Sequence, residues 1–208
     1  MTNDINPALV AYVEREIIPR YASFDSAHRE DHARAVIERA LELSSFYDVD
    51  INIVYAAAAC HDLGLAVDRK THHLESGRII RSDATLKALL GAEGLESAAR
   101  AAEDHRASSA TAPRSIYGRI VAEADRLIEP LTIIRRTIQY GLDHYPDLDK
   151  EGHWQRTLEH LKEKYGDGGY LKLWIPESSN AARLEELRKI IRDEEELKRI
   201  FEQIWKSF

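Results

Sequence analysis

Histidine and aspartate residues recur at three apolar stretches of the sequence. His61 and Asp62 directly follow the run from Ile53 to Cys60, the most apolar segment of the chain. Ionisable groups in such a place are costly to bury unless they are paired or bind a metal ion. His32 lies on the apolar stripe of a second predicted helix, and Asp125 lies at the edge of the stripe of a third. Two imidazoles and two carboxylates suit a divalent ion such as Zn, Mn, Fe, Co or Mg. The lack of sulfur ligands favours a catalytic site over a closed structural zinc site.

Each of these residues also has a plainer interpretation on its own. A lone histidine on an apolar stripe is more often a hydrogen-bonded core residue, and a lone Asp125 is more often a surface acid. Two helices that each bring an imidazole inward reverse that preference. His28 lies one helical turn before His32, so the sequence offers two candidates for the first histidine.

The elements that would position these residues are predicted to be helices throughout, which makes the chain all-α. Gly64 is a natural stop for the buried helix that ends near Leu63. Four consecutive alanines in that helix disfavour a strand. Helical spacing and breakers predict further helices at about 7–19, 26–46, 71–81, 83–91, 95–105, 115–129 and 131–142.

The residue composition changes near residue 145, where tryptophans and a glycine-rich turn at 166–169 first occur together. We expect residues 1–145 to form the helical domain that holds the histidines, and residues 146–208 to form a C-terminal helical extension packed on it as one compact domain. A last helix begins near Asn180, with an apolar stripe that either docks within the chain, which we favour, or forms a homodimer with a second copy. The stripe comprises Leu184, Leu187, Ile191, Leu197, Ile200 and Ile204.

Composition excludes several classes of protein. The chain has 208 residues, 29 basic and 36 acidic, for a net charge of -7. A long nucleic acid is therefore not an expected partner, since binding one relies on many Lys and Arg contacts to phosphate. Cys60 is the only cysteine, so an internal disulfide is excluded, and its apolar surroundings disfavour a nucleophilic thiol. No signal pattern or membrane-spanning run occurs, and we expect a cytoplasmic protein without a membrane partner.

The order His32, then His61-Asp62-Leu63-Gly64, then Asp125 resembles the HD-domain superfamily of metal-dependent phosphohydrolases. The spacings fit, with 29 residues from His32 to His61 and 63 from Asp62 to Asp125. The segment 72–77 (HHLESG) is similar to the following helix of that family. The segments 103–109 and 113–118 carry a closer likeness to HD hydrolases of about 200 residues with unassigned substrates. The likeness covers about residues 20–145.

The resemblance implies an all-α HD-domain helical bundle that holds a divalent cation. His32, His61, Asp62 and Asp125 would be the ligands, and His32 is preferred to His28 because Val36 stands four residues on, as in the family. Mn, Co, Zn, Ni, Mg and Fe are all compatible. Some HD proteins bind a second metal, and the histidines at 28, 72, 73 and 105 are candidates for that site or for supporting contacts. One ion is expected rather than two.

The implied reaction is hydrolysis of a small phosphorylated substrate, such as a nucleotide or related phosphoester. A metal at Asp62 would activate water, and His105 would act as general acid. Basic residues would bind the substrate phosphate, with Arg106, Lys70 and Arg29 as candidates. Two alternatives stay open: a binuclear-iron oxygenase of the HD type, and a non-catalytic regulatory module that binds a nucleotide.

Overall fold

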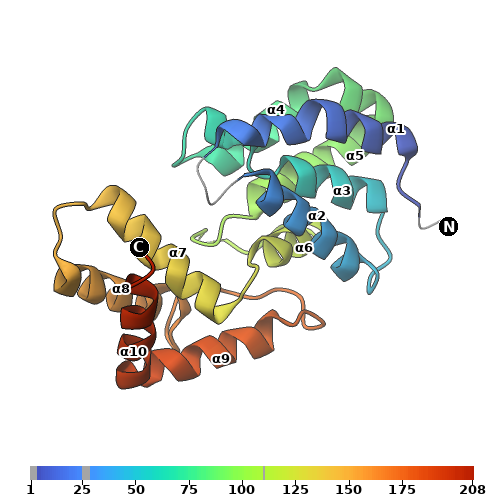
Figure 1. Cartoon of the computed structure of the whole chain (residues 1–208). Helices are drawn as coiled ribbons and strands as arrows, with labels where there is room; N and C mark the ends of the chain where they lie inside the picture. Colours follow the sequence, from blue (N-terminus) through green and yellow to red (C-terminus); the bar gives the residue numbers. More distant parts are fainter. Residues whose placement is uncertain (1–3, 25–28, 110) are drawn as a thin grey trace. The chain divides into compact units, whose positions relative to one another are not determined.

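The computed structural model describes residues 4–24, 29–109 and 111–208. His28 lies outside these residues, so its predicted role stays a prediction. The described residues form ten α-helices and no strand, which confirms the all-α prediction (Figure 1). The helices belong to two compact units, one of residues 1–127 with 174–178, and one of residues 128–173 with 179–208.

The first unit begins with a helical segment whose winding changes along its length. Helix α1 (Pro7–Tyr12) starts where the Asn6 side chain accepts a hydrogen bond from the Ala8 N–H. A wider π-helical stretch (Val13–Ile17) and a tighter 3-10 helix (Ile18–Ser23) follow. The predicted regular helix over 7–19 is therefore wrong in its winding and stops short of the observed end. The apolar side chains of the segment are nevertheless buried, among them Leu9, Val13, Ile17 and Tyr21.

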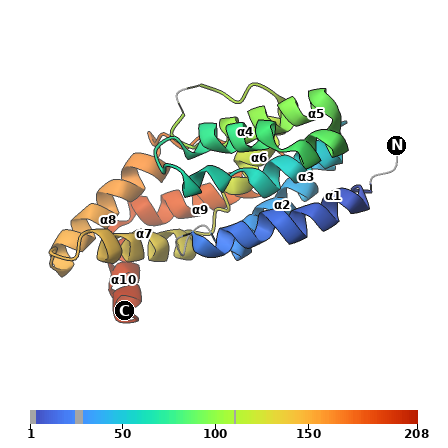
Figure 2. The ribbon, with the colours of Figure 1, turned by 90° about the horizontal axis from the view of Figure 1, so that it is seen from above.

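The core of the first unit is helix α3 (Ile51–Cys60), as predicted. Every residue from Ile53 to Cys60 is buried, and the Asp50 side chain caps the helix start. Helix α3 packs against α2 (Glu30–Ser44), α5 (Ala84–Asp104) and α6 (Ile116–Asp125). Figure 2 shows it running through the middle of this helical layer. The small alanine side chains allow this close packing on several sides.

Two predicted helices are joined in the structure. A short 3-10 helix (Leu63–Ala66) leads from α3 to α4 (His72–Ser82), and α5 then covers both predicted segments, 83–91 and 95–105. The expected break appears only as a kink at Gly91, where φ is 71°. Glycine tolerates this left-handed conformation because it has no Cβ.

The second unit contains α7 (Pro130–His144), α8 (Lys150–Tyr165), α9 (Asn180–Arg192) and α10 (Glu194–Trp205). The domain predicted from the sequence, residues 1–145, includes the residues of α7. In the structure these residues lie in the second compact unit, which begins at Ile128. The packing of the predicted C-terminal extension on the predicted first domain stays a prediction. Helix α8 was not predicted. The predicted single last helix is wrong, because the chain turns at Asp193, whose side chain caps α10.

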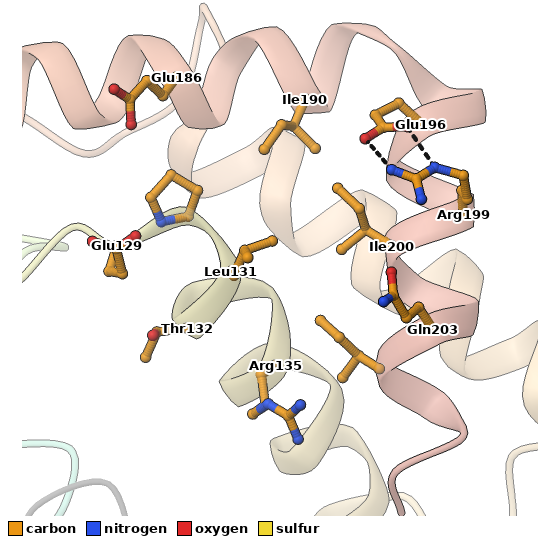
Figure 3. A pocket seen from close by; sticks show the side chains of 12 residues that line it. Glu129, Leu131, Thr132, Arg135, Glu186, Ile190, Glu196, Arg199, Ile200 and Gln203 are labelled. Carbon is orange, nitrogen blue, oxygen red and sulfur yellow. Dashed lines mark hydrogen bonds and ion pairs between the residues drawn. The ribbon is translucent and has the colours of Figure 1, made fainter.

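The apolar stripe of α9 and α10 is used within the second unit. All six of its members are buried there, and Trp154 meets Phe201 edge-on at 5.5 Å. Docking within the chain was the favoured expectation, and the homodimer stays a prediction. An open groove of about 640 Å³ remains between α7, α9 and α10. Figure 3 shows Leu131, Ile190 and Ile200 facing it, with Glu196 bound to Arg199 at one end.

None of the helices in the described part of the chain is long and apolar enough to cross a membrane.

Candidate metal centre

Four predicted ligands come together in the first unit from three separate places in the chain. His32 lies in the first turn of α2, His61 and Asp62 follow the last turn of α3, and Asp125 is the last residue of α6. His32 Nε2 is 3.2 Å from Asp125 Oδ1 and 3.7 Å from Asp62 Oδ2. His61 Nε2 is 3.1 Å from Asp62 Oδ2 and 3.7 Å from Asp125 Oδ1. The donor atoms thus converge on one small volume.

Asp62 presents its other carboxylate oxygen to a second pair of histidines. His72, the first residue of α4, places Nε2 3.5 Å from Asp62 Oδ1, and His105, just after α5, places Nε2 3.3 Å from the same oxygen. The two Nε2 atoms are 3.2 Å apart. Within the described residues, two ligand groups therefore share Asp62, namely His32-His61-Asp62 and Asp62-His72-His105.

Backbone carbonyls orient three of the imidazole rings. Nδ1 of His61 bonds to the Ala58 oxygen at 2.8 Å, Nδ1 of His72 to the Arg69 oxygen at 2.8 Å, and Nδ1 of His105 to the Ala102 oxygen at 2.6 Å. A carbonyl only accepts, so each Nδ1 carries the proton. In the neutral ring, Nε2 then holds a lone pair directed toward Asp62. This is the usual way in which proteins prepare a histidine to bind a metal.

The residues present fit a bound cation. His72 and His105 direct two Nε2 lone pairs at each other over 3.2 Å, an arrangement that is repulsive in the neutral state unless a positive charge lies nearby. His61 Nε2 is fully buried and makes no hydrogen bond of good geometry. Buried polar atoms are nearly always satisfied, so this one indicates a missing partner. Nitrogen and carboxylate donors without sulfur suit a catalytic divalent ion.

The pKa shifts of the ligand candidates also indicate a site for a cation. Burial disfavours the charged form of His61, but the carboxylates of Asp62 and Asp125 outweigh it and raise the His61 pKa to about 9. Burial would raise the pKa of Asp62, yet His61 and His105 hold it well below its usual range. The pKa of Asp125 is also lowered, against burial, by His32 and His61. The site therefore favours positive charge between its carboxylates, which a proton supplies when no metal is bound.

Three further predicted site residues, His73, Arg106 and Lys70, lie near His72. His73 lies beside His72, with ring centres 5.6 Å apart, but it belongs to neither ligand group. Burial, and then the charge of Arg106, lowers its pKa to about 4. Arg106 bonds to the Lys70 carbonyl, and the charge of Arg106 also lowers the His72 pKa, after burial and His105. Arg106 and Lys70 thus lie on the His72 side of the centre.

Arg29 is exposed immediately before α2, and no described contact joins it to the centre.

Several supporting residues were not predicted from the sequence. The Tyr21 hydroxyl donates to the Ala59 carbonyl at 2.9 Å and accepts from the Asp62 N–H at 3.4 Å. Ser76 Oγ accepts from the Gly64 N–H at 2.9 Å, which ties α4 to the turn after Asp62. An aromatic residue at helical spacing is typical of a core position, so no signal in the sequence indicates the role of Tyr21.

Cys60 takes no part in the centre. It is fully buried, and burial raises its thiol pKa to about 12, as expected for an inert core cysteine.

Comparison with known proteins identifies the family of this helical layer. Residues 29–129 match the HD domain, a range that includes α2 to α6 together with His32, His61, Asp62, His72, His105 and Asp125. No curated protein and no solved structure matches the chain. The family match agrees with the resemblance found in the sequence. The role of His32, His61, Asp62 and Asp125 as metal ligands stays a prediction. Residues 29–129 of the chain thus match an HD domain, which is consistent with a protein of the HD-domain superfamily.

Proposed function

We propose that this protein is a metal-dependent phosphohydrolase that acts on a small phosphorylated molecule, such as a nucleotide or related phosphoester. One observation carries the proposal: the two carboxylate oxygens of Asp62 face two groups of histidines whose Nε2 atoms converge on them. His32, His61 and His105 are buried, and His72 is partly buried. HD domains are generally metal-dependent phosphohydrolases, which supports the same reaction class.

His32, His61, Asp62 and Asp125 would hold the first ion. When bound, a divalent ion lowers the pKa of a water ligand toward neutrality and offsets charge on a phosphoryl group. The chain contributes fixed donors: the carbonyl bond of His61 keeps its Nε2 free of a proton once the cation is bound. Burial of His61 and Asp62 keeps competing water away from the ligand atoms.

A second ion is supported by the placement of His72 and His105. The sequence favoured a single ion, and that expectation stays a prediction. The shared Asp62 and the 3.2 Å separation of the two Nε2 atoms support a second position next to the first. The same placement supports His105 as a ligand rather than as the general acid considered from the sequence, because its Nδ1 already donates to the Ala102 carbonyl.

Arg106 and Lys70 are the best candidates to bind the substrate phosphate. Arg106 is partly exposed, and its charge acts on both His72 and His73. A guanidinium beside the centre would neutralise the charge of phosphate oxygens that project from it. Arg29 remains a candidate from the sequence alone.

The proposal is tested by adding Mn²⁺, Co²⁺, Zn²⁺, Ni²⁺ or Mg²⁺ to chelator-treated protein and measuring phosphate or pyrophosphate release from nucleotides and simple phosphoesters. We expect metal-dependent turnover that falls at least ~100-fold in Asp62→Asn. Asp31→Asn is the matched control, because Asp31 is an exposed carboxylate next to His32. Full activity in Asp62→Asn would exclude the proposed site.

The second ligand group also keeps an iron oxygenase as a candidate function. Two ions that share a carboxylate can support oxygen chemistry as well as hydrolysis. Two irons per chain with oxygen consumption, and no phosphate release with any divalent ion, would favour this alternative.

A further inference from the structure

The segment that precedes the HD match reaches into the candidate metal centre through one side chain. Tyr21 lies in the 3-10 helix Ile18–Ser23, eight residues before the matched range 29–129 begins. Its side chain is fully buried. Its ring centre is 6.4 Å from that of His61, so the phenol lies directly behind the His61-Asp62 turn.

The Tyr21 hydroxyl joins two backbone groups on either side of His61. It donates to the Ala59 carbonyl at 2.9 Å and accepts from the Asp62 N–H at 3.4 Å. A phenol hydroxyl has one proton and two lone pairs, so both bonds form at once. Helix α3 ends at Cys60, and the backbone has left helical geometry by Asp62, with φ -107° and ψ 6°. The hydroxyl thus satisfies backbone groups where the helix no longer does.

The orientation of the Asp62 carboxylate matters because each of its two oxygens faces a different group of histidines. Oδ2 faces His61 at 3.1 Å, and Oδ1 faces His105 at 3.3 Å. A small rotation of the Asp62 backbone would withdraw one oxygen from its histidines. The side chains Leu9, Val13, Ile17 and Ile18 anchor the N-terminal segment in the core and so fix the phenol.

We propose that Tyr21 is a positioning residue for the metal centre: its hydroxyl holds the turn at residues 59–62 so that Asp62 can serve both ligand groups. The inference rests on the proposed function in one respect, namely that a divalent ion binds at Asp62. It extends the functional unit beyond the matched HD range, to the helical segment that begins at Pro7.

The test measures binding of Co²⁺ alone to chelator-treated full-length protein, by titration and by the visible absorption of the bound ion. Tyr21→Phe keeps the ring and removes the hydroxyl. We expect its Co²⁺ affinity to fall about 10-fold or more, as is typical when a group that supports a ligand is lost, and the absorption bands to shift. Co²⁺ absorption responds to ligand geometry, which a general loss of stability would leave unchanged.

Tyr12→Phe is the matched control. Tyr12 belongs to the same N-terminal segment, and its hydroxyl bonds to Asp83 at 2.5 Å, away from the ligand groups. We expect Tyr12→Phe to bind Co²⁺ with the affinity and spectrum of the unmodified protein. If Tyr21→Phe does not fold, 3,5-difluorotyrosine at position 21 retains the hydroxyl but weakens it as an acceptor, and a weaker affinity with shifted bands is expected.

The outcomes separate this inference from the proposed function. Unchanged Co²⁺ affinity and spectrum in Tyr21→Phe, with only a lower melting temperature, would overturn the positioning role. Equal effects of Tyr12→Phe and Tyr21→Phe on Co²⁺ binding would overturn it as well. Failure of the unmodified protein to bind Co²⁺ would instead overturn the proposed function on which it rests.

Discussion

At the scale of single residues, the centre is built from side chains whose proton positions are fixed by the backbone. His61, His72 and His105 each donate Nδ1–H to a carbonyl three residues earlier. The same local geometry at three sites leaves three Nε2 atoms to face Asp62. The sequence could predict which residues converge, because ionisable groups beside apolar runs require partners. It could not predict the Tyr21 contact, since hydrogen bonds of a core aromatic depend on tertiary packing.

Removal of His72 tests the second ligand group. His72→Ala leaves His32, His61 and Asp125 in place, so we expect one ion fewer per chain and a retained first ion. His144→Ala is a suitable control because His144 is exposed in the second unit. Metal stoichiometry is measured by elemental analysis after dialysis. An unchanged stoichiometry at two ions per chain would show that His72 is not a ligand.

The raised pKa of His61 predicts a pH dependence of metal binding. The pKa is about 9 without metal, so a proton occupies Nε2 at neutral pH and must leave when an ion binds. We expect affinity for Co²⁺ to rise about tenfold per pH unit between pH 6.5 and 8.5, and calorimetry in buffers of different ionisation enthalpy should detect proton release. Affinity that does not change with pH would argue against displacement of this proton.

The same shift affects the stability of the metal-free protein. The folded-state pKa of His61 lies above its unfolded value of ~6.5. Its contribution to stability is therefore complete below pH 6.5 and is lost as the pH rises through about 9. Urea unfolding of chelator-treated protein should show a falling free energy of unfolding across this range. His61→Gln should remove that part of the dependence.

At the scale of elements, the apolar periodicity predicted most helices, and the boundaries depended on tertiary contacts. Helix α3 was predictable because it is apolar on all sides. Helix α8 was missed because it is rich in charged residues, although Trp154, Leu158 and Leu161 are buried on one side. The break at Asp193 was missed because the apolar stripe continues through it, while the Asp193 side chain starts a new helix by accepting from the Glu196 N–H at 3.0 Å.

Gly64 allows α4 to approach the turn after Asp62. A Cβ at Gly64 would overlap the His72 carbonyl and lie 2.7 Å from the Ser76 nitrogen, both backbone atoms. We expect Gly64→Ala to lower the free energy of unfolding by about 1–3 kcal/mol and to weaken metal binding by displacing His72. Gly168→Ala is the control, because a Cβ there meets nothing within 4 Å. Equal stability of the two variants in urea unfolding would contradict the close approach.

At the scale of the whole molecule, the two units are not contiguous in sequence. Residues 174–178 return to the first unit between two stretches of the second. Glu123 on α6 is fully buried and accepts the Trp174 N–H at 2.6 Å. The contact between Trp174 and Glu123 could not be predicted from the sequence. It joins residues 51 positions apart and depends on a carboxylate inside an apolar helix.

Glu123→Ala tests how much the segment 174–178 contributes to the stability of the first unit. The change leaves the partly buried Trp174 N–H and the buried Ile175 N–H without their carboxylate acceptor, and we expect the free energy of unfolding to fall by about 1–3 kcal/mol. Glu159→Ala, at an exposed position on α8, should be close to neutral. Chemical denaturation of both variants provides the comparison, and a neutral Glu123→Ala would mean that the segment adds little.

The most direct test of the central claim is the metal content per chain, measured by elemental analysis on protein purified without a metal-affinity tag. The account predicts at least one equivalent of a divalent ion in the unmodified protein, a second equivalent if His72 and His105 also act as ligands, and loss of the metal in Asp62→Asn. No bound metal, even after incubation with Mn²⁺, Co²⁺, Zn²⁺ and Fe²⁺, would contradict the assignment of His32, His61, Asp62 and Asp125 as a metal centre.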